Sequence, residues 1–146
     1  MSDNLKKCRE ILKSGEYTLV LFDGKMLLTD TKRGVKPLLD LLDANTDLSG
    51  FSAADKVVGK AAAFLYVLLN VREIYADVIS SSALSVLEQH KIPVEYTTLT
   101  DKIKNREGTG FCPMETAVLD EENPEKALEK IREKAKELAK NNKTAS

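Results

Sequence analysis

Hydrophobic residues recur along the chain with two different periods, which together predict alternating helices and strands. A helix is expected over residues 4–14, where apolar side chains lie at helical spacing at Leu5, Cys8, Ile11 and Leu12. Residues 17–22 and 25–29 are mostly apolar and flank Asp23-Gly24, so they predict a hairpin with a two-residue turn. Because both strands are nearly all apolar, we expect helices on both faces of the sheet.

A long apolar stretch predicts a helix in the middle of the domain. We expect this helix over residues 52–70, because Ser52 and Asp55 have the spacing of a capping box and precede an apolar run. Apolar residues occupy almost every side of it, which is typical of a buried helix. A shorter helix over residues 35–42 precedes it, with Pro37 in its first turn.

The following segment predicts two parallel strands joined by a helix. The strands are expected over residues 73–79 and 94–99. The helix between them covers residues 83–90, with Ser80-Ser81-Ser82 at its start and His90 as a C-terminal cap. A strand–helix–strand order with short links implies parallel neighbours and a right-handed crossover.

Two further helices complete the predicted domain. A short one begins at Pro113, and the last covers about residues 123–140, with Asn123 as its N-cap, before a frayed tail over residues 141–146. The whole chain, residues 1–146, is therefore predicted to be one α/β domain. Its expected architecture is a three-layer α/β/α sandwich on a mixed sheet.

Composition and charge exclude several classes of protein. The 22 basic and 23 acidic residues give a formal net charge of −1, and aromatic residues are 5% of the chain, so we expect no nucleic-acid partner. The longest apolar run, residues 61–69, is about half of a membrane span, so we expect no membrane partner. The polar start has no signal-like segment and the two cysteines have no disulfide spacing, which predicts a cytoplasmic protein.

Lys60 is the most informative candidate for a functional residue. It is the only charge between Val57 and Leu69, on a helix that should be buried, and an unpaired buried ammonium is costly. One interpretation is structural, in which Lys60 reaches solvent or pairs with Asp55 or Asp23. The other is a cleft lysine that binds an anion or acts as a base or nucleophile.

Cys112 and Glu115 lie at the start of the predicted short helix. With Pro113 in the first turn, Cys112 takes the N-cap, where free backbone N–H groups and the helix dipole favour a thiolate. Glu115 follows three residues later, where a carboxylate can reach back to the N-cap amide. A small buried cysteine and ordinary capping explain the same pattern, so both interpretations stay open.

The glycine-containing loop before Cys112 is a third candidate. In residues 105–110 two glycines flank a threonine and an arginine precedes them, so backbone N–H groups and a guanidinium could meet a phosphate or carboxylate. The spacing is neither that of a Walker loop nor that of a dinucleotide fingerprint. The same composition is also typical of a simple turn that binds no ligand, so this interpretation stays open.

Two segments of the chain support a family resemblance. Residues 55–63, DKVVGKAAA, and residues 105–115, NREGTGFCPME, resemble the signature segments of a small prokaryotic domain family of unassigned function, and the resemblance extends over residues 5–119. It implies a cytidine-deaminase-like fold, in which a hairpin is followed by a central helix and two α/β units. It also implies that Lys60 faces the cleft in which deaminases bind their substrate.

The resemblance does not extend to zinc chemistry. Zinc deaminases use a His-x-Glu on the central helix and a Pro-Cys-x-x-Cys at the start of the next helix. The corresponding residues, 58–63 and 80–84, contain no His, Cys or Glu. The soft ligands of the chain, Cys8, Cys112 and His90, have no metal-site spacing. We therefore expect no metal, no cofactor and no deamination.

The first functional hypothesis is a non-zinc, deaminase-like domain that binds a small anionic or nucleotide-like ligand in a cleft. Its ligand-binding candidates are Lys60, Asn105, Arg106, Gly108, Thr109, Gly110, Cys112 and Glu115. An enzyme using Lys60, Cys112 or Glu115 is one alternative, and a protein-interaction module, including a homo-oligomer, is another. If the candidates form one site, Lys60 should lie near Glu115, with that carboxylate or the loop carbonyls accepting from its ammonium.

Overall fold

The described residues alternate between helices and strands in the order that the hydrophobic pattern predicts, with one exception. The computed structural model describes residues 2–32, 34–102 and 113–145, with side chains up to residue 140. The elements are α1 (Asp3–Lys13), β1 (Leu19–Phe22), β2 (Leu27–Asp30), α2 (Lys36–Asp43), β3 (Ser52–Val58), α3 (Lys60–Leu68), β4 (Glu73–Ser80), α4 (Ser81–Gln89), β5 (Val94–Thr100), α5 (Pro113–Ala117) and α6 (Pro124–Ala145).

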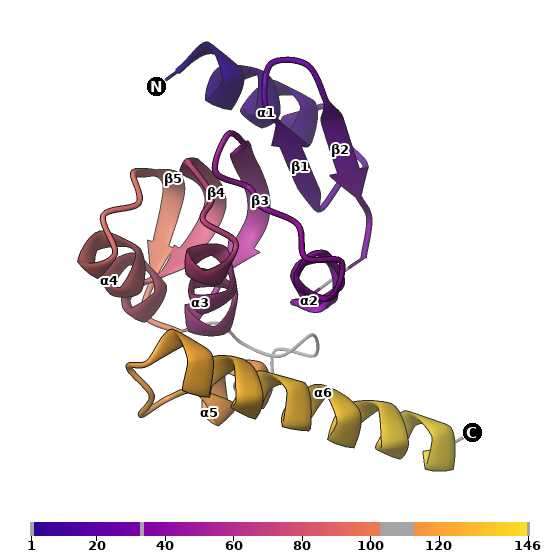
Figure 1. Cartoon of the computed structure of the whole chain (residues 1–146). Helices are drawn as coiled ribbons and strands as arrows, with labels where there is room; N and C mark the ends of the chain where they lie inside the picture. The colour runs from indigo at the N-terminus through magenta and orange to yellow at the C-terminus, as the bar shows by residue number, and fades with distance from the viewer. Residues whose placement is uncertain (1, 33, 103–112, 146) are drawn as a thin grey trace.

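The five strands that the structure describes belong to one mixed sheet, in the order β2-β1-β3-β4-β5 (Figure 1). β1 is antiparallel to both of its neighbours, β2 and β3. β3, β4 and β5 are parallel, and the strand–helix–strand order predicts this for β4 and β5. The structure therefore confirms a mixed α/β fold, and the carboxyl ends of the three parallel strands meet at one edge of the sheet.

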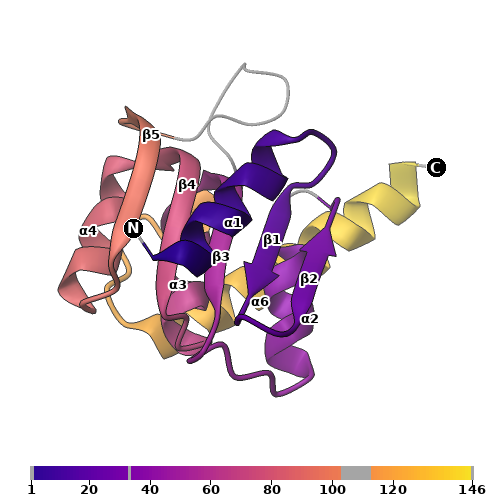
Figure 2. The same cartoon turned by 90° about the horizontal axis from the view of Figure 1, so that it is seen from above.

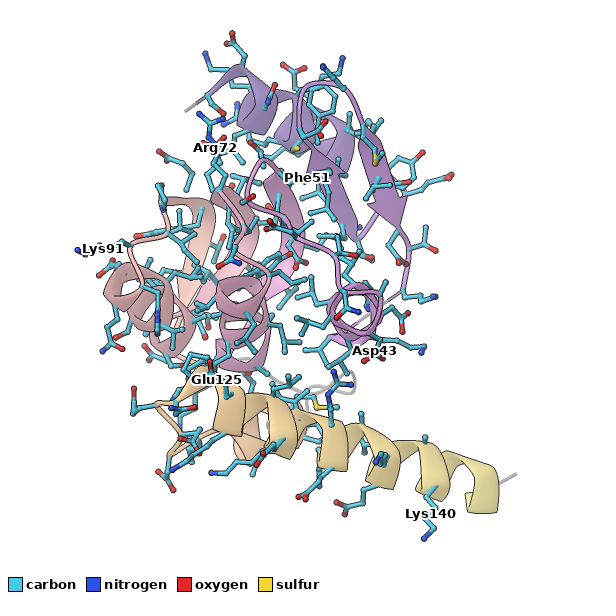
Figure 3. The ribbon with its side chains drawn as sticks, viewed as in Figure 1. Asp43, Phe51, Arg72, Lys91, Glu125 and Lys140 are labelled. Atoms are coloured by element: carbon cyan, nitrogen blue, oxygen red, sulfur yellow. The ribbon has the colours of Figure 1, made fainter. Side chains whose placement is uncertain are left out.

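Helices are distributed unequally between the two faces of the sheet. α1 lies over β1, β3 and β4 on one face, and β5 lies outside its cover (Figure 2). α2, α3 and α4 lie on the other face, and α6 runs beneath α3 and continues past α2 (Figure 1). Arg132 on α6 forms an ion pair of 2.7 Å with Asp43, which Figure 3 shows at the end of α2 that lies above α6.

β3 is the exception, since the expected helix over residues 52–70 begins only at Lys60, after Gly59 as its N-cap. The capping-box prediction is wrong because residues 52–58 pair with β1 and β4 on both sides. Ala53 packs into the core beneath α3 and Ala54 into the core beneath α1, which is the alternation of a strand. Alanine favours helices by itself, so sheet pairing overrides the local preference here.

The hairpin also differs from its prediction, because its loop has four residues. Asp23 N–H donates to the Met26 carbonyl, and the Asp23 carboxylate accepts from the amides of Lys25 and Met26. These backbone hydrogen bonds, with that of Met26 first, lower the pKa of Asp23, and turn chemistry alone explains this residue. Gly24 has a φ of +100°, which favours glycine. Leu27 is 45% exposed, so β2 is not covered on both faces as predicted.

The buried apolar residues form two clusters, one on each side of the sheet. The smaller lies under α1 and the larger surrounds α3, whose residues 60–66 are all buried, as the apolar pattern predicts. α6 contributes Ala127 and Ile131 to the larger cluster, and it continues to Ala145, beyond the predicted end near residue 140. Within the described ranges, no helix combines the length and the apolar character that crossing a bilayer requires.

Candidate functional site

The first turn of α3 binds a carboxylate that comes from far along the chain. The backbone N–H groups of Lys60 and Ala61 donate to the two carboxylate oxygens of Glu115, at 2.7 and 2.9 Å. These donors would otherwise lack a partner, because the first N–H groups of a helix have none within it and the N-cap, Gly59, has no side-chain acceptor. The helix dipole further favours a negative charge here. This α3 end is therefore an anion-binding position, occupied by Glu115.

Gly59 leaves the space that this carboxylate occupies. A Cβ built on Gly59 would lie 2.5 Å from Cδ and Oε1 of Glu115 and 2.6 Å from Oε2. The backbone of Gly59 is extended, with a φ of −96°, so no conformational demand for glycine exists here. Close approach of the Glu115 carboxylate, rather than the backbone angle, is what favours a residue without a side chain.

The Lys60 ammonium is buried and has acceptors other than Glu115. The residue is 7% exposed, and its Nζ donates to the Leu119 carbonyl oxygen at 2.9 Å. Nζ also lies 3.6 Å from a carboxylate oxygen of Glu122, whose side chain is largely exposed, and 5.8 Å from the centre of the Phe64 ring. The carbonyl is the main partner, because exposed ion pairs contribute little. The alternative in which Lys60 pairs with Asp55 or Asp23 is therefore wrong.

The structure brings together two of the predicted site residues and does not describe the others. Lys60 and Glu115 meet through the Lys60 backbone, whereas the prediction assigned the contact to its ammonium. The remaining candidates lie outside the described residues: Asn105, Arg106, Gly108, Thr109, Gly110 and Cys112. Sequence reasoning missed Leu119, because any residue has a carbonyl and no side-chain type identifies it as an acceptor.

Asp55 and Tyr66 form a hydrogen-bonded pair between β3 and α3. The Tyr66 hydroxyl donates to Oδ2 of Asp55 at 2.7 Å, and Tyr66 is fully buried. Burial raises the pKa of Asp55 to about 7, while the hydrogen bond from Tyr66 opposes this shift. Burial and the neighbouring Asp55 likewise raise the pKa of Tyr66 well above its usual value. The expected capping role of Asp55 is replaced by this contact.

Substituting Asp55 by asparagine should stabilise the protein at high pH only. The pKa of Asp55 is about 7 in the folded state against 3.8 ordinarily. Between these pH values the folded protein holds a proton on Asp55 that the unfolded chain loses, so the free energy of unfolding falls as pH rises. The full shift corresponds to about 4 kcal/mol. Asp55 is only partly shielded from solvent, so the effect should be smaller than this full value. We expect Asp55→Asn to raise the free energy of unfolding by about 1–3 kcal/mol at pH 8 and by nearly nothing at pH 4.

Urea unfolding of both proteins at the two pH values measures this difference, because all other titrating groups are common to both. An equal difference at pH 4 and pH 8 would contradict the raised pKa of Asp55.

Comparisons with known proteins place the chain in a family. The family described as "TM1506: Domain of unknown function (DUF1893)" matches residues 7–135, which is most of the chain. The chain belongs to the DUF1893 family. It is similar to the crystal structure of a DUF1893 family protein (TM1506) from Thermotoga maritima, with a TM-score of 0.80 and 28% identity over 90% of this chain and 88% of that one. No curated protein matches it.

The described part of this DUF1893 domain contains no group of three or more metal-ligating side chains. Cys8 is buried, its thiol donates to the Ser52 carbonyl at 3.4 Å, and burial raises its pKa to about 12. A thiol in this state is neither a nucleophile nor a metal ligand. Ser80 is the N-cap of α4 and His90 its C-cap, as the sequence predicts.

Two surface hollows of the DUF1893 domain lie away from the α3 end. One, of about 370 Å³, is lined by Leu12, Lys13, Gly15, Lys56 and Asp77. The other, of about 320 Å³, lies between the hairpin and α2. Neither is lined by Lys60 or Glu115, so the predicted cleft corresponds to neither hollow.

Proposed function

We propose that this DUF1893 domain is a non-catalytic ligand-binding domain with a cytidine-deaminase-like fold. The order of its elements supports this fold, because a helix and a hairpin precede helix–strand units and one sheet lies between α1 and α2–α4 in a three-layer arrangement. The likeness to the TM1506 structure supports the same sheet and helix arrangement in the family. On this proposal the ligand site lies at the carboxyl end of the parallel strands, where α/β sheets bind their ligands.

Because residues 52–58 are a strand, the two zinc motifs of deaminases can also be compared with α2 and α3, each one helix earlier than in the sequence comparison. The helix after the hairpin is α2, and the next helix after a strand is α3. Neither α2 nor the first turn of α3 contains a His or Cys, and residues 80–84 contain none either. Both ways of matching the helices therefore favour a domain without the zinc-activated water of deaminases.

The binding of Glu115 at the α3 end is the observation that carries the ligand proposal. Two backbone N–H donors and a helix dipole form an acceptor site for one carboxylate, and Gly59 keeps it open to a group of that size. We propose that a small anionic or nucleotide-like ligand places its carboxylate or phosphate there. The ligand then takes the donors that Glu115 occupies in the free protein, and Glu115 competes with it.

The geometry favours this proposal over an enzyme that uses Lys60. A Schiff-base or general-base lysine needs a free amine directed at the substrate. Lys60 instead directs its ammonium at the Leu119 carbonyl and Glu122, an arrangement typical of a structural cation. Cys112 lies outside the described residues, so the alternative that uses its thiol stays a prediction.

The proposal predicts that added anions stabilise a protein without the Glu115 carboxylate. Glu115→Ala should lower the free energy of unfolding by about 1–2 kcal/mol, the usual value of helix N-terminal partners. Acetate or inorganic phosphate should then raise the melting temperature of Glu115→Ala more than that of the wild type, because the freed donors bind the anion. Thermal melts in chloride, acetate and phosphate at one ionic strength measure the effect.

Glu129→Ala is the matched control, since Glu129 is exposed on α6. Equal anion effects on Glu115→Ala, Glu129→Ala and the wild type would show only a general salt effect and would reject an exchangeable anion site at α3.

A further inference from the structure

β5 is an edge strand with a largely exposed surface. It spans Val94–Thr100 and pairs only with β4 among the described strands (Figure 2). Residues 95–99 are all exposed, and two of them are large and apolar, Tyr96 at 41% and Leu99 at 46% exposed. An exposed edge of this kind can pair with another strand.

The pairing with β4 determines which backbone groups of β5 are free. The Ile74 N–H donates to the Pro93 carbonyl, and Ile74 lies opposite Val94. Because a parallel ladder uses every second residue of a strand, residues 95, 97 and 99 direct their N–H and C=O groups toward β4. Tyr96 and Thr98 therefore direct theirs away from β4, to the side of β5 where no other described strand lies.

β5 lacks the features that usually prevent an edge strand from pairing. Natural edges carry lysines, prolines, bulges or inward charges. The sequence VEYTTLT contains no basic residue and no proline, and Glu95 is its only charge. The opposite edge, β2, is shorter at four residues and ends in the charged Asp30. Of the two edges, β5 is the better suited to accept a strand.

We propose that β5 joins two copies of this chain in a symmetrical dimer, by antiparallel pairing centred on Thr97. In this register Tyr96 lies opposite the partner's Thr98, so the free backbone groups of both strands meet and exchange hydrogen bonds. Thr97 lies opposite Thr97 of the other copy. Glu95 lies opposite Leu99 of the other copy, so within β5 no two carboxylates lie directly opposite each other.

Charges beside β5 favour a second copy as the occupant. Lys91 precedes β5 and extends outward from the turn after α4 (Figure 3), and Asp101 follows β5 directly. Antiparallel pairing places the start of one β5 near the end of the other, which brings Lys91 and Glu95 of one copy to the same end of the contact as Asp101 and Lys102 of the other, two charges of each sign. A contact of seven residues on each strand is small beside the roughly 1,600 Å² of a standard interface, so the dimer should depend on protein concentration.

A disulfide at the centre of the pair tests the register. Thr97 would form a non-hydrogen-bonded pair with its copy, where Cα atoms lie about 4.5 Å apart, within the range of a disulfide. In a Cys112→Ser background, Thr97→Cys should form covalent dimers on oxidation. Thr29→Cys, exposed on the edge strand β2, is the matched control and should remain monomeric. Equal cross-linking of the two variants, or none in either, would overturn the proposal.

Hydrogen exchange gives an independent test that needs no cysteine. In concentrated wild-type protein the amides of Tyr96 and Thr98 should be protected, and this protection should disappear on dilution and in Thr98→Lys. The Thr97 amide, bonded to β4, should stay protected in all samples and reports that the fold is intact. A sedimentation coefficient of a monomer at every concentration, with unprotected Tyr96 and Thr98 amides, would reject a second copy as the occupant of this edge.

Discussion

Replacing Ile131 by alanine is expected to lower the free energy of unfolding by about 2–4 kcal/mol, because it removes three buried carbon atoms and leaves a cavity. Ile131 on α6 is completely buried, in the cluster that also contains Phe64 and Val118. Glu115 on α5 binds the α3 end, and Leu119, between α5 and α6, accepts from the Lys60 ammonium. Loss of Ile131 should therefore loosen both contacts.

Leu138→Ala is the matched control for this prediction. Leu138 lies two helical turns further along α6, is only partly buried and belongs to neither core cluster. Its loss should cost less than about 1 kcal/mol. Chemical denaturation of both variants measures the two values. Equal costs at the two positions would mean that α6 is not held on α3 by Ile131.

Gly59→Ala is expected to lower the free energy of unfolding by about 1–3 kcal/mol, the usual cost of overpacking. The new methyl group would lie 2.5 Å from the Glu115 carboxyl group, so Glu115 must leave the α3 end or α5 must move. The backbone itself accepts alanine, because its φ is −96°. Most of the cost should thus come from the carboxylate.

A double-mutant cycle with Glu115→Ala isolates this cause. Once the carboxylate is absent, Gly59→Ala should cost almost nothing, so the two substitutions should show a large coupling energy in urea unfolding. An unchanged cost of Gly59→Ala in the Glu115→Ala background would mean that the glycine serves the backbone or another neighbour. The same cycle shows whether Glu115 occupies the α3 end in solution.

Hydrophobic periodicity and capping residues, both read from the sequence by itself, determined most of the elements of this protein and the burial of its central helix. α1, α4 and the start of α6 follow from apolar spacing and capping residues, which act within a few positions of the chain. Burial of residues 61–66 follows from their apolar character on every side. These features depend on local interactions, and for that reason the sequence predicts them.

The tertiary structure decided the features that depend on distant neighbours. Residues 52–58 have the composition of a helix start, but pairing with one strand on each side, β1 and β4, makes them a strand. Glu115 has the position of a local capping residue, but it caps a helix 55 residues away. Lys60 was correctly expected to need an acceptor, yet the acceptor is a backbone carbonyl, which no residue type reveals. Sheet pairing and the capping of a helix by a distant residue of the same chain depend on three-dimensional proximity, which local propensity does not describe.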